Sequence, residues 1–126
     1  MLRLAAQNPD QQVVRYAHMD ATNLWFPDDA FDAVICTWAL HLMTDPDAVI
    51  GELARVLHPS GRVVVVTLTL GGVLTPWPIR EAVTRILGIT PFDPVDLSAR
   101  LANHGLQPIV MDRWGAGLFR CAECTA

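Results

Sequence analysis

Trp38 and His41 are the residues of this sequence whose types and positions could most readily do chemistry. They follow a strand pattern, and open α/β sheets bind their ligands beyond the carboxyl ends of the strands. The imidazole of His41 could take a proton from a hydroxyl or an amine near neutral pH, so we predict a catalytic role for it. The alternatives are structural: His41 packs or forms a hydrogen bond in the core, and the Trp38 indole caps the core.

Two other groups of residues have types that suit metal binding or redox chemistry. Cys121 and Cys124 form a Cys-x-x-Cys motif, but the sequence has no second ligand pair and the motif falls at the end of a strand pattern. We expect two ordinary thiols there, with redox or metal binding as a weaker alternative. Asp28, Asp29 and Asp32 lack the glycine and the terminal glutamate of a calcium loop, which favours a solvated acidic turn. We therefore predict no metal site.

A strand, a helix and a second strand must position the loop that holds these aromatic residues. The β-branched and apolar residues of 31–37 predict the first strand. Asp45-Pro46 supplies an N-cap acceptor and a proline at the first helical position, and the following apolar residues recur at helical spacing. Residues 58–61 should end the helix, with Gly61 supplying a positive φ. Residues 62–70 open with consecutive valines, which is typical of a strand covered on both faces.

The remaining patterns predict a single α/β domain over residues 1–126. Further elements are expected at residues 1–7 (the end of a helix), 13–18 (a strand), 79–87 and 95–104 (helices, the second closed by Gly105), and 108–113 and 118–122 (a hairpin).

Composition and charge limit the partners. The formal net charge is −4 and the nine basic residues form no cluster, which excludes an electrostatic footprint for nucleic acid. The longest apolar run, residues 63–70, is too short to cross a bilayer, and the first residues do not resemble a signal peptide. We therefore expect a soluble, cytoplasmic protein that binds neither nucleic acid nor a membrane.

Three spaced motifs resemble those of one enzyme family. Met19-Asp20-Ala21, followed by Leu24 and Phe26, is similar to the acidic motif and turn after that family's third strand. Phe31-Asp32-Ala33-Val34 is similar to the start of its fourth strand, and Glu-Leu-Ala-Arg-Val-Leu-His-Pro-Ser-Gly at 52–61 to its next helix-to-strand turn. In this order the motifs resemble class I S-adenosylmethionine-dependent methyltransferases that act on small molecules, including the quinone-biosynthesis type. Trp25 and Ser60 depart from the family pattern, which has Pro and Gly there.

The resemblance implies a cofactor, S-adenosylmethionine, and a small-molecule methyl acceptor. It implies that the Asp20 carboxylate accepts a hydrogen bond from the adenine amino group and that the Ala21 N–H meets the ring. It places Trp38 and Ala39 beside the methionine part of the cofactor. The alternative for Asp20 is that it caps the turn after a strand.

The glycine-rich first half of the family's domain has no counterpart in the sequence. We therefore expect an incomplete Rossmann-like sheet, mostly parallel with a C-terminal antiparallel hairpin, in which the strand at 13–18 has lost its neighbours. An unpaired strand edge invites association, so a homodimer or a partner chain that completes the sheet is expected. The alternative function is a catalytically inactive methyltransferase-like module for interaction or regulation. Gly115-x-Gly117 lies between two strand patterns and is rejected as a cofactor loop.

Overall fold

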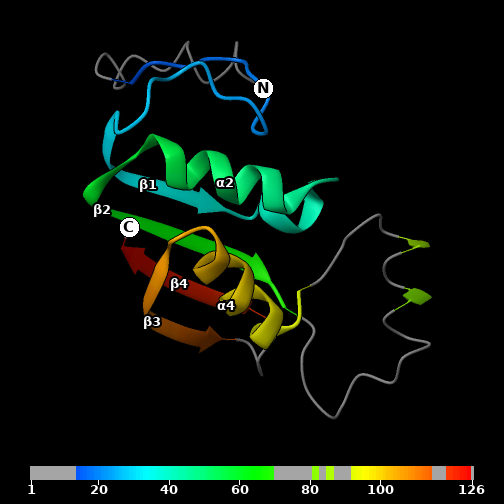
Figure 1. Cartoon of the computed structure of the whole chain (residues 1–126). Helices are drawn as coiled ribbons and strands as arrows, with labels where there is room; N and C mark the ends of the chain where they lie inside the picture. Colours follow the sequence, from blue (N-terminus) through cyan, green and yellow to red (C-terminus); the bar gives the residue numbers. More distant parts are fainter. Residues whose placement is uncertain (1–13, 70–80, 83–84, 87–91, 115–118, 126) are drawn as a thin grey trace.

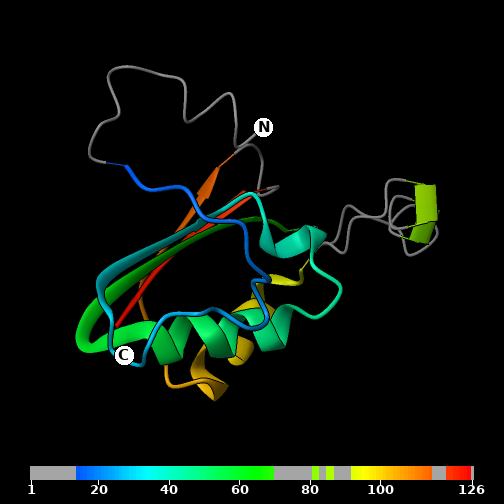
Figure 2. The same cartoon turned by 90° about the horizontal axis from the view of Figure 1, so that it is seen from above.

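A four-stranded sheet with two α-helices on one face forms the centre of the computed structural model, which describes residues 14–69, 81–82, 85–86, 92–114 and 119–125 (Figures 1 and 2). Its strands are β1 (Phe31–Thr37), β2 (Leu57–Leu68), β3 (Gln107–Trp114) and β4 (Phe119–Thr125). Its helices are α2 (Pro46–Val56), α4 (Pro94–Asn103) and the short 3-10 helix η2 (Leu40–Leu42).

The strand order is β1-β2-β4-β3, which places β2 and β4 at the centre. β1 and β2 are parallel and are connected through α2, whereas β4 pairs antiparallel with both β2 and β3. The predicted α/β class and the C-terminal antiparallel hairpin are confirmed. Within the described residues, the parallel part of the sheet is the β1–β2 pair.

The start of α2 follows from its cap. The Asp45 carboxylate accepts a hydrogen bond from the Ala48 N–H at 3.0 Å, and Pro46 occupies the first turn, as the sequence predicts. The helix ends at Val56, and β2 begins at once with Leu57, five residues before the predicted start of that strand. The prediction was wrong there because Leu57 turns to extended backbone and pairs with Phe31 instead of continuing the helix.

The core lies between the sheet and the two helices, which cover the same face (Figure 2). From β2 the side chains of Val63 and Val65 point into it, and from α4 those of Leu97 and Leu101 do so. Cys36 of β1 is a buried free thiol within this core, and burial raises the pKa of its thiol, so it packs there as a small apolar residue.

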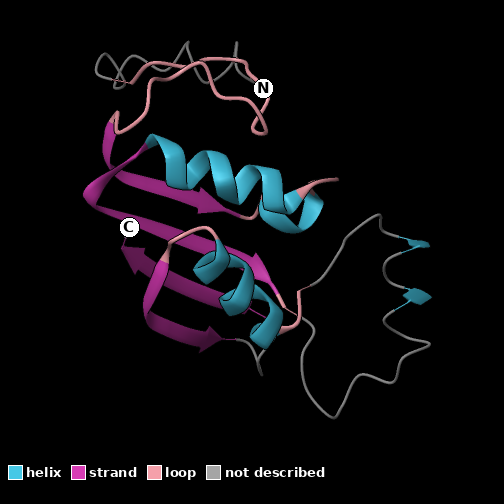
Figure 3. Ribbon diagram, viewed as in Figure 1, coloured by secondary structure: helices cyan, strands magenta, loops and turns pink. Residues whose placement is uncertain are grey.

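The strand predicted at residues 13–18 is not present in the described part of that range. Residues 14–18 form a loop that continues into the segment before β1 (Figure 3). A strand needs a neighbour to pair its N–H and C=O groups, and within the described residues this segment pairs with none of the four strands. The apolar pattern alone could not supply that partner.

Two glycines close turns for different reasons. Gly105, just past α4, has φ = +82°, which confirms it as the residue that ends the helix. Gly61 is not among the positive-φ residues, contrary to the prediction; it is needed because a Cβ would lie 2.9 Å from the Asp32 carbonyl oxygen. The helices expected at 1–7 and, for the most part, at 79–87 lie outside the described residues. Among the described residues, no helix has the length and apolar composition needed to span a bilayer.

Candidate functional site

The loop beyond β1 begins with a strained tryptophan. Trp38 has φ = +58°, a left-handed conformation that bulky side chains rarely adopt, and 52% of its surface is exposed. Its backbone N–H donates to the Val66 carbonyl at 2.8 Å, so hydrogen bonding between β1 and β2 extends to Trp38 itself. Such strain occurs preferentially at ligand sites. Ala39 follows as the N-cap of η2 and is partly buried against the core.

His41, on η2, is buried beneath this loop. Its ring meets the Trp38 ring edge-on, with the centroids 6.3 Å apart. Two groups approach its Nδ1 atom: the Leu68 backbone N–H at 3.4 Å and the Thr67 hydroxyl oxygen at 3.2 Å. An amide N–H can only donate, so Nδ1 is an acceptor and the ring proton belongs on Nε2. Burial lowers the pKa of His41, so the ring is neutral at physiological pH.

Asp20 and Ala21 lie in a turn at the start of the segment that leads to β1, which continues through residues 22–30. The Asp20 carboxylate accepts hydrogen bonds through Oδ1 from the Thr22 N–H at 2.9 Å and from the Thr22 hydroxyl at 2.7 Å. The bond from the Thr22 N–H, and to a smaller extent the bond from its hydroxyl, lower the pKa of Asp20. The exposed carboxylate is therefore ionised at neutral pH. Both bonds use Oδ1, and Oδ2 has the chemistry to accept from a ligand donor. Ala21 is partly buried against the core.

An ionic clamp that the sequence did not single out holds the next part of this segment. Arg55 of α2 donates to both Glu52 oxygens at 2.8 Å, to the Asp28 carboxylate at 2.7 Å, and to the carbonyls of Leu24 and Phe26 at 3.0 and 2.9 Å. Glu52 also accepts from the Leu24 N–H at 2.8 Å. We call Glu52, Arg55 and Asp28 the Arg55 clamp. The Glu-x-x-Arg spacing was the available signal, because residues three apart share a helix face.

The clamp predicts a specific pH dependence of stability. Hydrogen bonds from Arg55 and then from the Leu24 N–H lower the pKa of Glu52 from 4.5 to about 2. A lowered folded-state pKa means that ionised Glu52 stabilises the fold above pH 4.5 and that this contribution is lost as the pH falls from 4.5 towards 2. Urea denaturation across this range should give a flatter profile for Glu52→Gln than for the wild type. Asp32→Asn, which removes an exposed carboxyl, should keep the wild-type slope; equal slopes for all three proteins would contradict the role of Glu52.

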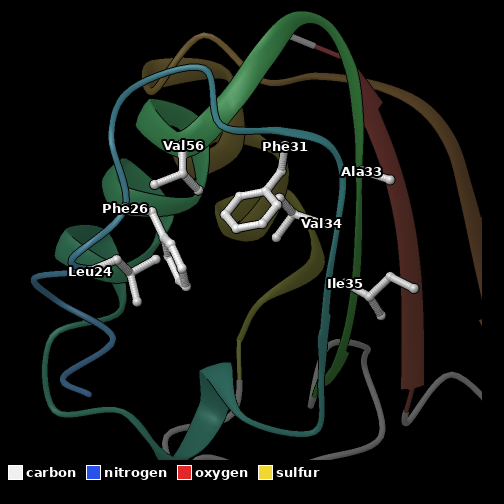
Figure 4. A pocket seen from close by; sticks show the side chains of 7 residues that line it. All are labelled: Leu24, Phe26, Phe31, Ala33, Val34, Ile35 and Val56. Carbon is white, nitrogen blue, oxygen red and sulfur yellow. The ribbon is translucent and has the colours of Figure 1, made fainter. Parts of the chain in front are cut away.

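An apolar pocket of about 240 Å³ lies between this segment and the edge of β1. Leu24, Phe26, Phe31, Val34 and Val56 converge on it, whereas Ala33 and Ile35 project from the other side of β1 (Figure 4). Phe26 and Phe31 meet edge-on with their centroids 4.9 Å apart. The clamp therefore fixes one wall of the pocket, and β1 forms the other.

The other candidate residues do not gather at this site. Trp25 is 78% exposed and does not line the pocket. Cys124 is a buried cysteine on β4, and the side chain of Cys121 is not described. Among the residues that the structure describes, no three His, Cys, Asp or Glu side chains are grouped to hold a metal ion.

Comparisons with known proteins identify the fold and the family. A family model described as "Methyltransferase domain" matches residues 1–65. The demethylmenaquinone methyltransferase of Clavibacter sepedonicus is 46% identical over 52 residues, which are 41% of this chain and 21% of that protein. The uncharacterized methyltransferase YcgJ of Bacillus subtilis is 39% identical over 61 residues, 48% of this chain and 24% of that protein.

Solved structures extend the similarity to nearly the whole chain. The structure of YcgJ matches 98% of this chain and 73% of that chain, with a TM-score of 0.71 and 18% identity. The geranyl diphosphate C-methyltransferase of Streptomyces coelicolor, solved with S-adenosyl-L-homocysteine, matches 98% of this chain and 56% of that chain, with a TM-score of 0.78 and 13% identity. At these identities the structures show the fold alone.

The sequence matches are partial in length. The segments aligned with the two relatives span only about a fifth to a quarter of those proteins. The family model nevertheless covers just over half of this chain, through β1, α2 and most of β2. The chain belongs to the class I S-adenosylmethionine-dependent methyltransferase family.

Proposed function

We propose that this chain supplies part of the cofactor site of an S-adenosylmethionine-dependent methyltransferase whose acceptor is a small molecule. The observation that carries the proposal is the strained, half-exposed Trp38 at the carboxyl end of β1, because backbone strain clusters at ligand sites and open α/β sheets bind ligands at this end of their strands. The activities for which the Clavibacter and Streptomyces proteins are named support a small-molecule acceptor. A cytoplasmic location stays a prediction from the composition.

The residues present fit the cofactor in their chemistry. Asp20 is exposed and ionised, and Thr22 fixes one of its oxygens, so the other can accept from an adenine amino group. The Ala21 N–H and the loop of Trp38 and Ala39 complete the proposed contacts. S-adenosylmethionine, when bound, supplies a methyl group on a positively charged sulfur. The chain then has to orient the donor and acceptor and exclude water from them.

In this proposal His41 helps to position Trp38. Its low exposure and the acceptor role of Nδ1 leave it neutral with its proton on Nε2. Its ring packs against the Trp38 indole in a T-shaped arrangement. A direct catalytic role, the expectation from its residue type, stays a prediction that requires Nε2 to face the acceptor.

The cofactor role of Asp20 can be separated from its turn role by substitution. Asp20→Asn keeps an oxygen for the Thr22 N–H but presents an amide donor to the adenine amino group, so the Kd for S-adenosylhomocysteine should rise about tenfold or more. Isothermal titration calorimetry measures the Kd. Thr22→Ala, which removes one turn bond and leaves the carboxylate, should shift the Kd much less.

Two outcomes would count against the proposal. An unchanged Kd in Asp20→Asn would leave Asp20 as a turn residue only. Failure of the wild-type chain to bind S-adenosylhomocysteine at millimolar concentration would favour the alternative, a catalytically inactive module for interaction or regulation, as far as the chain alone is concerned.

A further inference from the structure

The two ring nitrogens of His41 have different surroundings. Nδ1 accepts from the Leu68 backbone N–H and lies 3.2 Å from the Thr67 hydroxyl oxygen. The ring proton is therefore on Nε2, because an amide N–H can only donate. Within the part of the chain that the structure describes, Nε2 has no hydrogen-bond partner. Only 6% of the His41 surface is exposed, so the Nε2–H group is a buried donor without an acceptor.

A buried donor of this kind requires an explanation. Burying a polar group without a hydrogen bond destabilises a fold, and most buried polar atoms in proteins have a partner. The exceptions include groups that bind or act on a ligand. In an imidazole the two nitrogens lie on different sides of the ring, so a ring that binds β2 through Nδ1 directs its Nε2–H away from that strand.

Thr67 holds Nδ1 from a position where the core has no need of a hydroxyl. Side chains on one face of β2 are buried in alternation, and Val63 and Val65 fill the core there with apolar groups. Thr67 is the next residue in this row and is fully buried, although valine has nearly the same shape without a polar atom. Its hydroxyl faces Nδ1 of His41. The hydroxyl therefore orients the ring, which a valine could not do.

The buried donor lies at the edge of the sheet where ligands bind. β1 and β2 are parallel and end on the side where η2 lies (Figure 1). The His41 ring packs against the half-exposed Trp38, which follows β1 with a strained backbone. Open α/β sheets bind ligands beyond these carboxyl ends. A ligand held against the indole is therefore close to the imidazole as well.

We propose that His41 donates a hydrogen bond through Nε2 to an oxygen atom of the methyl acceptor, and that Thr67 is the positioning residue that orients this donor. The inference rests on the proposed function and deepens it by naming the acceptor class, a phenol or an enol. An N–H group that is already oriented stabilises the negative charge that such an oxygen carries when it reacts.

The same arrangement separates oxygen acceptors from amines and donors from bases. An oxygen has more than one lone pair, so it can accept from Nε2–H while other electrons react. An amine has a single lone pair, which methyl transfer consumes. With Nδ1 occupied and Nε2 protonated, the imidazole has no lone pair for a proton. In this proposal His41 binds the acceptor and is not its base, and the hydroxyl proton passes to water.

NMR of the imidazole rings in the full chain, labelled with nitrogen-15 histidine, tests the donor directly. The His41 ring should be protonated at Nε2 and unprotonated at Nδ1. Phenol should move the Nε2–H signal of His41 downfield, as a new hydrogen bond does. Aniline has the same size but is a poor acceptor, so it should bind about three- to tenfold more weakly and leave this signal in place. The rings of His18, His58 and His104 are internal controls and should respond to neither compound.

Substitutions separate the donor from a structural role. His41→Phe keeps a ring without a donor and should lose the preference for phenol over aniline. His41→Gln can place an amide N–H near the position of Nε2 and should keep part of that preference. Thr67→Val keeps the shape of the core but should shift the Nδ1 signal and weaken phenol binding about threefold. Thr67→Ser restores the hydroxyl and should behave as the wild type does.

Three results would overturn the inference: a His41 ring protonated at Nδ1, an Nε2–H signal that does not respond to phenol, or equal affinities of the wild type for phenol and aniline. All three are measured on the wild type, so they do not depend on whether a variant folds. Each can be obtained while the chain binds S-adenosylhomocysteine, in which case the proposed function stands. A response of Nε2–H to phenol in a chain that does not bind S-adenosylhomocysteine would support the donor and its ligand class but count against the proposed function.

Discussion

Replacing Gly61 with alanine should lower the free energy of unfolding by about 3 kcal/mol, the upper part of the range for overpacked sites. A Cβ at this position would lie 2.9 Å from the Asp32 and His58 carbonyl oxygens and 2.8 Å from a methyl group of Leu57. Two of these neighbours are backbone atoms at the point where the register of β1 and β2 shifts, between Phe31 and Ala33. The strands must therefore separate to admit the methyl group.

Gly51→Ala provides the control. Gly51 lies within α2, and its added Cβ would meet only the flexible His104 ring, at 3.3 Å. Alanine has a higher helix propensity than glycine by about 1 kcal/mol, so this variant should be neutral or more stable. Urea denaturation with comparison of m-values measures both effects. A Gly61→Ala protein within about 1 kcal/mol of the wild type would show that the close approach is not needed.

Arg55→Met should release the segment before β1 and lower the thermal midpoint by several degrees. The substitution keeps an apolar stem but leaves the carbonyls of Leu24 and Phe26 without their donor and Glu52 without its guanidinium. Asp28 then loses its ion pair with α2. Fluorescence anisotropy of Trp25 in a variant that retains only this tryptophan should fall, and limited proteolysis should cut between residues 22 and 30.

Arg62→Met removes an exposed ion pair of a different kind and serves as the control. Its single bond to Glu123 lies on the surface, where such pairs contribute about 0–1 kcal/mol. Arg55→Lys keeps the charge without the planar fork and should fall between the wild type and Arg55→Met. If Arg55→Met and Arg62→Met gave equal thermal midpoints and equal Trp25 anisotropy, the clamp would have no anchoring role.

Local signals explain which parts of the fold could be predicted. The start of α2 could be predicted because Asp45 and Pro46 act on the next turn of backbone, and the end of α4 because Gly105 adopts the left-handed conformation by itself. The loop at residues 14–18 could not be predicted, because a strand depends on a neighbour elsewhere in the sequence. The sequence predicts Gly61 from the φ that a turn requires. In the structure glycine is required there because the Asp32 carbonyl of β1 leaves no room for a Cβ.

The candidate site shows the same division. The position of Trp38 beyond β1 followed from the strand pattern, but its positive φ did not, since tryptophan disfavours that conformation. The Glu52–Arg55 spacing was visible on the helix, whereas the carbonyls that Arg55 binds are 29 and 31 residues away in the chain. Contacts at such separations are set by the tertiary fold.

The placement of β4 between β2 and β3 sets the order in which the sheet can assemble. Val63 pairs with Val34 through a short connection and with Cys124 almost half of the chain later. Closing a longer loop costs more chain entropy and slows the contact, so β1, α2 and β2 should condense first. Until the β3–β4 hairpin docks, β2 exposes a row of unpaired valine backbone, and this interval is when a newly made chain is most prone to aggregate.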